Sequence, residues 1–309
     1  MKAYIAKRLL FLIPMFFLVS FAAFTLMNLT TENPAMIILR SQGIPNITQD
    51  MIDQVTIEYG FDQPFILRYF AWLGNAICLN LGNSYNTGAP VGEMLFHALG
   101  YTLQLVGSTI LTVIFFSFFF GILCAIWAGR TFDGVTRVLM YIISAMPAYW
   151  IGTLSIWLFS NVLHWLPTSG VGTFSNFIMP TFILAIGYFT FYFRVIRNSM
   201  LENIHKNYVL FLRSSGVRER KIIKHILRNS LQTAVSGFCM AIPGMLAGSV
   251  VIENVFAWPG IGRLCVNAIF ARDIPIIQGY VLMLAMLYCC FNLIADLINA
   301  ALNPRLRRG

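Results

Sequence analysis

Charged residues are scarce in this chain of 309 amino acids, where they make up 11% of the sequence against about 25% in an ordinary soluble domain. Hydrophobic residues make up 58% and aromatic residues 15%. So few charges argue against a soluble globular protein, because a water-facing surface needs polar groups to cover it. The 27 phenylalanines exclude disorder, since disordered segments are poor in aromatic side chains. We therefore expect much of the chain to lie in lipid.

Motifs of catalysis and of metal binding are also absent. The chain has no G-x-x-x-x-G-K-[ST] phosphate-binding loop, no H-E-x-x-H zinc motif and no G-x-S-x-G nucleophile elbow. The four histidines are scattered, and the six cysteines form no C-x-x-C pair. The adjacent Cys289 and Cys290 are expected to point to different faces of a helix, which does not suit a soft metal ion. We therefore predict no catalytic residue, no metal site and no cofactor within the chain.

Long apolar runs, by contrast, are abundant. A helix needs about 20 apolar residues to cross the hydrocarbon core of a bilayer. The runs that approach this length are residues 9–27, 101–128, 138–165, 177–193, 231–252 and 276–295. The first run is too long for the core of a cleaved signal peptide, and no persuasive cleavage site follows it. The sequence therefore predicts an all-α membrane protein with six transmembrane helices.

Lysine and arginine are distributed unevenly between the predicted loops. With the N-terminus inside, only Arg40, Arg68, Arg263 and Arg272 lie on the outer side, whereas most acidic residues lie there. Cytoplasmic loops of membrane proteins carry an excess of basic residues. We therefore predict that both termini are cytoplasmic. The formal net charge of +9 is then a consequence of topology and not a sign of nucleic-acid binding.

Two of the predicted loops are long enough to have structures of their own. Residues 1–27 comprise a short cytoplasmic segment and the first span, and residues 28–100 are expected to form an outer subdomain with a helix at about Met51–Tyr59. The other five spans occupy residues 101–302, interrupted by a basic inner loop at 194–230, and residues 303–309 form a basic cytoplasmic tail. The domain organisation is thus one membrane core with one outer subdomain.

The inner loop has a helical pattern with a break in its middle. An apolar stripe recurs at Ile204, Tyr208, Phe211 and Leu212, and the segment 214–216 then interrupts it. Glycine in that segment suits the left-handed end of a helix, which a residue with a Cβ adopts only at a cost. We predict two short cytoplasmic helices joined by a tight turn. Such a projection suits a membrane protein that takes its energy from a partner, although a merely solvated basic loop would have the same composition.

Prolines and glycines mark the predicted central spans. Pro147, Pro180 and Pro243 fall within the third, fourth and fifth spans, where proline removes a hydrogen bond and can kink a helix. Gly244 and Gly248 form a G-x-x-x-G motif, which allows helices to approach closely. These residues are candidates for lining a pathway. Ordinary packing within the membrane explains them equally well.

Acidic residues that could couple transport to an ion are not evident in the spans. Only Asp296 comes close, at the inner end of the sixth span, and it is expected to serve packing or to reach Arg305. A secondary carrier normally needs more than one buried acid. A self-sufficient channel or carrier is therefore the weaker hypothesis, and no pair of polar residues in the spans supports an intramembrane enzyme.

Several motifs carry a resemblance to a known family. They are Tyr208-Val209, Arg213-Ser214-Ser215-Gly216-Val217, His225-Ile226-Leu227-Arg228-Asn229, Tyr59-Gly60-Phe61-Asp62-Gln63-Pro64, Leu81-Gly82-Asn83-Ser84, Pro90-Val91, the segment 253–262 and the segment 299–305. Together they resemble the permeases of binding-protein-dependent ABC importers, specifically the dipeptide, oligopeptide and nickel family. The likeness extends over nearly the whole chain.

The resemblance implies a fold, a set of partners and a role for the inner loop. It implies a type I importer permease in a bacterial inner membrane, paired as a heterodimer with a second homologous permease. It also implies two cytoplasmic ATPases, which bind ATP and magnesium, and an extracytoplasmic solute-binding protein. Contact with the ATPase is expected at Tyr208, Arg213, Ser214, Ser215, Gly216, Val217, Arg218 and Glu219. Where the broader motif has two alanines this chain has Phe211 and Leu212, which suggests an ATPase cleft shaped for larger side chains.

The outer segments look closest to the nickel and metal-chelate branch of the family. These segments are residues 38–46 and 253–269. The spans contain no cluster of histidine, cysteine or carboxylate that would suit a bare metal ion, so metal is expected to pass as a chelate. Dipeptides and oligopeptides are the alternative substrates.

Overall fold

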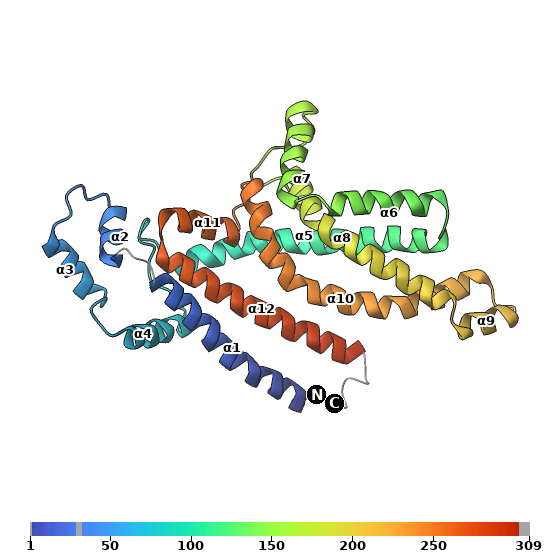
Figure 1. Ribbon diagram of the computed structural model, residues 1–309, viewed down its shortest axis with the longest axis horizontal. Coiled ribbons are helices and arrows are strands. Elements are labelled where there is room, and N and C mark those ends of the chain that lie inside the picture. Colours follow the sequence, from blue (N-terminus) through green and yellow to red (C-terminus); the bar gives the residue numbers. More distant parts are fainter. Residues whose placement is uncertain (1, 29–32, 303–309) are drawn as a thin grey trace. The chain divides into compact units, whose positions relative to one another are not determined.

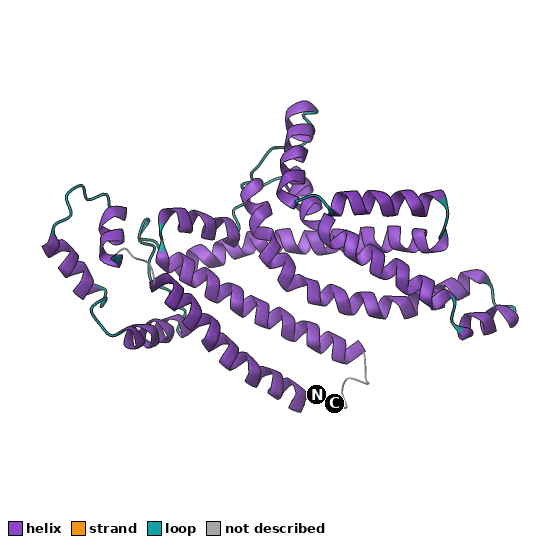
Figure 2. Ribbon diagram, in the orientation of Figure 1, coloured by secondary structure: helices purple, strands orange, loops and turns teal. Residues whose placement is uncertain are grey.

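The computed structural model describes residues 2–28 and 33–302, which form helices joined by loops with no strand in these ranges (Figures 1 and 2). The elements are α1 (Lys2–Asn28), α2 (Pro34–Ser41), α3 (Gln49–Glu58), α4 (Phe65–Ile77), α5 (Val91–Ile126), α6 (Thr131–Ser144), α7 (Ala148–Ser155), the π-helical segment η1 (Ile156–Val162), α8 (Phe174–Ile204), α9 (Asn207–Ser214), α10 (Glu219–Val255), α11 (Ile261–Ala271) and α12 (Ile274–Leu302). The all-α prediction is confirmed.

Two compact units share these helices. The first combines the residues up to Tyr101 with Pro259–Cys289, and the second combines Thr102–Trp258 with the residues from Cys290 on. The helices α5 and α12 therefore each contribute to both units. The predicted basic tail, residues 303–309, lies outside the described residues.

The first unit contains three short helices between α1 and α5. The helix predicted at Met51–Tyr59 is confirmed as α3, but α2 and α4 were not predicted. The start of α2 has clear signals, because the Asn33 side chain accepts a hydrogen bond from the backbone N–H of Ala35 at 3.0 Å and Pro34 occupies the first turn. The described part of the segment 28–100 therefore contains three helices before α5, where the sequence predicted one.

A cluster of aromatic side chains joins α4 to α1. Tyr69 and Leu73 of α4 are buried against Phe24 of α1. The hydroxyl groups of Tyr69 and Ser20 lie 2.9 Å apart, so the phenol keeps a hydrogen bond where it is removed from water. This contact fixes α4 beside the C-terminal half of α1.

A buried carboxylate, Asp273, holds the loop before α5. It accepts hydrogen bonds from Ser84 Oγ at 2.5 Å, from the Tyr85 backbone N–H at 3.2 Å and from Asn86 Nδ2 at 3.2 Å. These donors satisfy a charge that would be costly to bury alone. The sequence analysis placed Asp273 in an outer loop and did not foresee its burial, because its partners lie far away in the chain. The bonds set the position of Tyr85.

In the second unit, α8 and α10 pack side by side through small residues (Figure 1). A Cβ added at Gly237 of α10 would lie 2.9 Å from Cε1 of Tyr192, and one at Gly244 would lie 3.3 Å from the hydroxyl oxygen of Tyr188. The same hydroxyl lies 3.5 Å from a Cβ built at Gly248. Glycine therefore lets α10 approach the tyrosines of α8, as the G-x-x-x-G motif suggested.

Three helices in the described part of the chain are long and apolar enough to cross a membrane. They are α5, α8 and the part of α12 at Ile274–Ile298, and a fourth crossing is reached if α6 and α7–η1 count as one bent span. The described apolar stretches of α1 and α10, Pro14–Asn28 and Met240–Val255, are shorter. The number of spans, predicted as six, stays a prediction.

The predicted third span, residues 138–165, is wrong as a single helix. The helices α6 and α7 meet at an angle of 100° across a break of a few residues. Pro147 lies in this break and precedes the first residue of α7, so it lies between two helices and not inside one. The residue before a proline is pushed away from helical backbone angles, which explains why α6 ends ahead of it. Pro180 and Pro243 do lie inside helices, in α8 and α10.

The predicted short helices of the inner loop are only partly right. The helix α9 is short, with eight residues. The second one is the beginning of α10, which runs without interruption for 37 residues into the predicted fifth span. Ile222 and Ile226, four residues apart, are both buried and continue the apolar face of α10 into the polar region. The same effect extends α8 beyond the predicted end of the fourth span, to Ile204.

Candidate coupling site

The turn between α9 and α10 is a Schellman motif centred on Gly216. This glycine has φ +70°, in the left-handed region that the sequence predicted for it. Its N–H donates to the carbonyl of Arg213 at 3.0 Å, and the N–H of Val217 donates to the carbonyl of Leu212 at 3.1 Å. A Cβ added at Gly216 would meet no atom within 4 Å. Glycine is therefore needed here for its backbone angles and not for space.

An ion pair crosses this turn. Arg213 Nε lies 2.9 Å from Glu219 Oε1, so the last turn of α9 is joined to the first turn of α10. Both side chains are largely exposed, and such pairs contribute less than about 1 kcal/mol. Ser214 Oγ donates to the Phe211 carbonyl at 2.9 Å, which leaves the hydroxyl at the surface of the turn. The pair and the Schellman motif together define the angle between the two helices.

The base of the hairpin is tied to α8 by buried polar contacts. Asn203 of α8 donates through Nδ2 to Ser230 Oγ of α10 at 3.2 Å and accepts through Oδ1 from the Tyr208 hydroxyl of α9 at 3.4 Å. Val209 is fully buried beside this network. Three helices are therefore connected at one level, so that a displacement of α9 moves α8 and α10 with it.

Large apolar side chains project from the opposite face of α9. Leu210 is 70% exposed and Phe211 is 69% exposed, whereas Leu212 is half-buried. Exposed apolar surface of this kind marks a contact with another protein or with lipid. Of the two positions that replace alanines in the broader motif, Phe211 is the one available to a partner.

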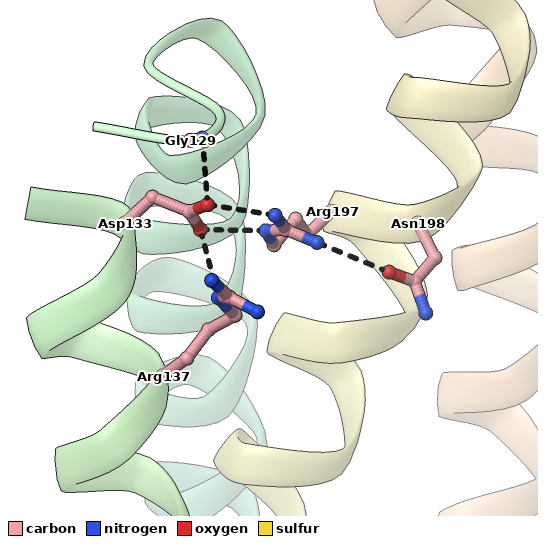
Figure 3. A network of polar contacts seen from close by, with 5 residues as sticks. All are labelled: Gly129, Asp133, Arg137, Arg197 and Asn198. Atoms are coloured by element: carbon pink, nitrogen blue, oxygen red, sulfur yellow. Dashed lines mark hydrogen bonds and ion pairs between the residues drawn. The ribbon is translucent and has the colours of Figure 1, made fainter. Parts of the chain in front are cut away.

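A buried salt bridge braces the C-terminal part of α8 (Figure 3). Asp133, at the start of α6, is completely buried and receives two hydrogen bonds of 2.7 Å from Arg197 of α8, one from Nε and one from Nη2. The backbone N–H of Gly129 donates to the same carboxylate at 3.1 Å, and Arg137 lies 3.4 Å from it. The bidentate geometry fixes the direction of both helices. The α5–α6 connection and α8 therefore move as one piece.

The sequence analysis missed this clamp. Asp133 and Arg197 are separated by 64 positions, and Arg197 was counted only as a basic residue of the inner loop. The one available signal was that Asp133 follows a turn at Gly129 and lies in the first turn of an apolar helix. An isolated carboxylate in such a place needs a partner.

A third buried carboxylate, after Asp273 and Asp133, belongs to α10. Glu253 Oε1 accepts hydrogen bonds from Thr102 Oγ1 of α5 at 2.7 Å and from Ser249 Oγ at 3.0 Å. The expectation that Asp296 was the only acid close to a span is therefore wrong, since Asp133 and Glu253 are both fully buried in helices. Asp296 itself is half-buried in α12, and its suggested partner Arg305 lies outside the described residues.

No three His, Cys, Asp or Glu side chains in the described ranges lie together in a way that would hold a metal ion. Cys289 is buried and Cys290 exposed, so the two thiols do point to different faces of α12, as expected. Side-chain geometry therefore supplies no ion site in this part of the chain.

The decisive comparison is with models of protein families. Residues 117–308, more than half of the chain, match the family described as the inner membrane component of binding-protein-dependent transport systems. The chain belongs to this family. It is thus a permease subunit of an ABC import system, and its homologues are transport components and not enzymes.

Curated relatives match this permease from end to end. The metal-staphylopine import system permease protein CntB of Staphylococcus aureus is 43% identical over 309 residues, which cover 100% of this chain and 99% of that protein. The oligopeptide transport system permease protein AppB of Bacillus subtilis and the glutathione transport system permease protein GsiC of Escherichia coli are each 32% identical, with 99% of both chains covered. The family resemblance inferred from the motifs is confirmed.

Among solved structures, the permease resembles a chain in the crystal structure of an amino acid ABC transporter with histidines. The TM-score is 0.54 at 15% identity, with 68% of this chain and 94% of the other covered. At this identity the likeness shows the fold alone. The matched fold agrees with the helical core described above.

Proposed function

We propose that this permease is one of two membrane subunits of an importer that moves a metal chelate, such as a nickel chelate, into the cell. The observation that carries the substrate class is the identity of 43% over the full length with a permease for metal-staphylopine, against 32% for permeases of peptides and glutathione. Import of dipeptides or oligopeptides is the second candidate, supported by those other relatives.

The donor groups of the chain favour a chelate over a bare ion. Nickel prefers imidazole, thiolate and carboxylate ligands held together in a fixed geometry. No such group is present among the described residues, and the buried acids Asp133 and Glu253 are engaged by an arginine and by two hydroxyl groups. A metal whose coordination is already filled by a chelator needs no ligand from the protein.

The candidate coupling site supports a mechanism in which separate partner subunits supply the energy, complete the pathway and deliver the solute. We infer that a cytoplasmic ATPase receives the turn at Gly216 together with the exposed face of α9 at Leu210 and Phe211. A second permease completes the pathway and a solute-binding protein delivers the chelate from outside. Six spans and cytoplasmic termini complete this proposal. Pro180, Pro243, Gly244 and Gly248 are candidates for helix kinks or for lining the pathway.

Uptake by the reconstituted complex tests the substrate. Proteoliposomes containing this permease, its partner permease, both ATPases and the binding protein should accumulate nickel supplied with staphylopine. Free nickel or a dipeptide should enter about tenfold more slowly, since loss of one good interaction costs about this factor. Preferred uptake of the dipeptide would reverse the choice of substrate. Accumulation by this chain alone, without ATPase, would contradict the permease mechanism.

Topology is tested independently by reporter fusions. A fusion after Gly216 and another at the C-terminus should report the cytoplasm, and a fusion at Asp62 should report the outside, because basic loops remain on the inner side. An external signal at Gly216 would remove any contact with a cytoplasmic ATPase. Fusions are read in intact cells with an enzyme that is active on only one side of the membrane.

A further inference from the structure

The first unit contains two adjoining cavities that no part of the coupling mechanism uses. Their volumes are about 450 and 570 Å³, within the range of small-molecule sites. Tyr59, Trp72, Tyr85, Asn75 and Gln278 line both cavities. These five residues come from α4 and the segment before it, from the loop before α5 and from α12. Aromatic faces and amide groups thus converge on one space.

One wall of this space is a connected row of aromatic rings that ends at a cation. Tyr85 meets Tyr59 edge to face with centroids 6.2 Å apart, and Tyr59 stacks on Phe61 at 5.8 Å. The guanidinium carbon of Arg68 lies 5.1 Å from the centre of the Phe61 ring. Arg68 also donates through Nη2 to Asn28 Oδ1 at 2.6 Å. The cation is therefore held in a fixed place while part of its donor set remains available.

The two cavities are also lined by an amide side chain, that of Gln278. Gln278 of α12 is 7% exposed, and among the described residues its side chain has no hydrogen-bond partner. Its amide is not among the fully enclosed polar atoms without a partner, so water or a ligand in the cavities can reach it and form its hydrogen bonds. Because Gln278 lines both cavities, its amide is placed to bind whatever fills them.

The charges indicate what this space would accept. Among the described residues that line the two cavities, Arg68 is the only cation and Glu58 the only carboxylate. One fixed guanidinium suits a single carboxylate, with which it can form paired hydrogen bonds. Burial raises the pKa of Tyr85, so its phenol stays protonated and can donate at neutral pH. The aromatic row suits a flat or apolar group next to the carboxylate.

We propose that this outer cavity is a receiving site for the transported solute, in which Arg68 binds a carboxylate and Gln278 binds a neighbouring polar group. The proposal rests on the proposed function. Amino-carboxylate metal chelates and peptide C-termini both offer this chemistry, and a bare metal ion does not. A solute released by the binding protein would be held on the outer side before the pathway opens.

Thiol protection tests binding independently of transport. Asn75→Cys is introduced into the full transporter in nanodiscs, with the exposed Cys78 changed to serine, and is labelled with a membrane-impermeant maleimide. The probes are nickel–staphylopine, a dipeptide, and the same dipeptide amidated at its C-terminus. Protection by a probe with a free carboxylate, and not by the amidated peptide, supports the site. Absence of protection by every probe at millimolar concentration overturns it, whichever solute the wild type imports.

Uptake by variants supplies the second readout. Arg68→Gln should raise the concentration of loaded binding protein needed for half-maximal nickel–staphylopine uptake by about tenfold, the usual loss for a charge-assisted hydrogen bond. Arg68→Lys should keep this concentration close to the wild-type value, because the positive charge remains. Gln278→Leu should raise it several-fold. Arg40→Gln is the control, because it also removes one positive charge from the predicted outer segment and Arg40 lines neither cavity.

The outcomes separate this proposal from the proposed function. If Arg68→Gln and Gln278→Leu both need the same concentration of loaded binding protein as the wild type for half-maximal uptake, the receiving site is overturned. The assignment of the protein as an importer subunit is then unaffected. Failure of the wild type to import the chelate would contradict the assignment, and the protection experiment would still decide the site. Loss of ATPase stimulation by unloaded binding protein in Arg68→Gln would show that the cavity receives the binding protein, which also overturns the proposal.

Discussion

Replacement of Gly216 by valine should uncouple ATP hydrolysis from import. At φ +70° a residue with a Cβ carries a cost of about 1–2 kcal/mol, and a β-branched residue carries more. That cost reduces the population of the native turn by about tenfold or more. We therefore expect nickel–staphylopine uptake per ATP hydrolysed to fall at least about tenfold, with the protein still inserted. The measurement is a paired assay of uptake and phosphate release in proteoliposomes.

The chain offers a matched control for this change. Gly43 in the outer subdomain has φ +73°, and a Cβ there would also meet no atom within 4 Å. Gly43→Val thus introduces the same local strain far from the coupling turn in sequence and should leave the ratio of uptake to hydrolysis unchanged. Gly216→Asn should keep most activity, because asparagine enters the left-handed region more easily. Unchanged uptake in Gly216→Val would remove the coupling role of the turn.

Loss of the buried carboxylate in Asp133→Asn should destabilise the permease severely. Arg197 would keep at most one of its two 2.7 Å bonds, to the amide oxygen, and its mostly buried charge would lose the opposite charge that compensates it. Breaking a buried pair on one side typically costs about 3–5 kcal/mol. We expect a large fall in the thermal unfolding temperature of the purified complex, and a lower yield of inserted protein.

An exposed ion pair of the same unit serves as the comparison. Glu202 and Lys206 lie 3.2 Å apart on the surface of the inner loop, and Glu202→Gln should change stability by less than about 1 kcal/mol. The double variant Asp133→Asn with Arg197→Met should recover part of the loss, since no uncompensated charge then remains. A wild-type unfolding temperature for Asp133→Asn alone would show that the clamp does not brace α8.

The sequence predicted those features that depend on local backbone geometry or on long apolar runs. Gly216 marked the end of α9, and the composition indicated helices in a membrane. The length of α10 could not be predicted in the same way, because its first turns are polar except for a stripe that includes Ile222 and Ile226. Burial of that stripe depends on contacts within the folded unit, which single-sequence hydropathy does not contain.

The polar contacts between distant parts of the chain could not be predicted from the sequence. Asp133 pairs with Arg197, and Asp273 binds a loop nearly 190 positions away. Each carboxylate looked like a residue of a solvated loop, since spacing along the chain does not show which distant groups meet. For Pro147 the sequence predicted a continuous helix where the structure has none. This proline in an apolar run was assigned to the interior of one kinked helix, whereas α6 ends before it and α7 begins after it at an angle of 100° to α6.

The unbroken course of α10 restricts how this protein can vary. A helix of 37 residues is about 55 Å long, and it joins the turn after Gly216 to the buried carboxylate of Glu253. Inserting a single residue between Ile226 and Gly237 would rotate one end against the other by about 100°. Glu253 would then face away from Thr102, or the turn would face away from the ATPase that we propose as its partner. Insertions and deletions should therefore be tolerated in the loops but excluded from this rod.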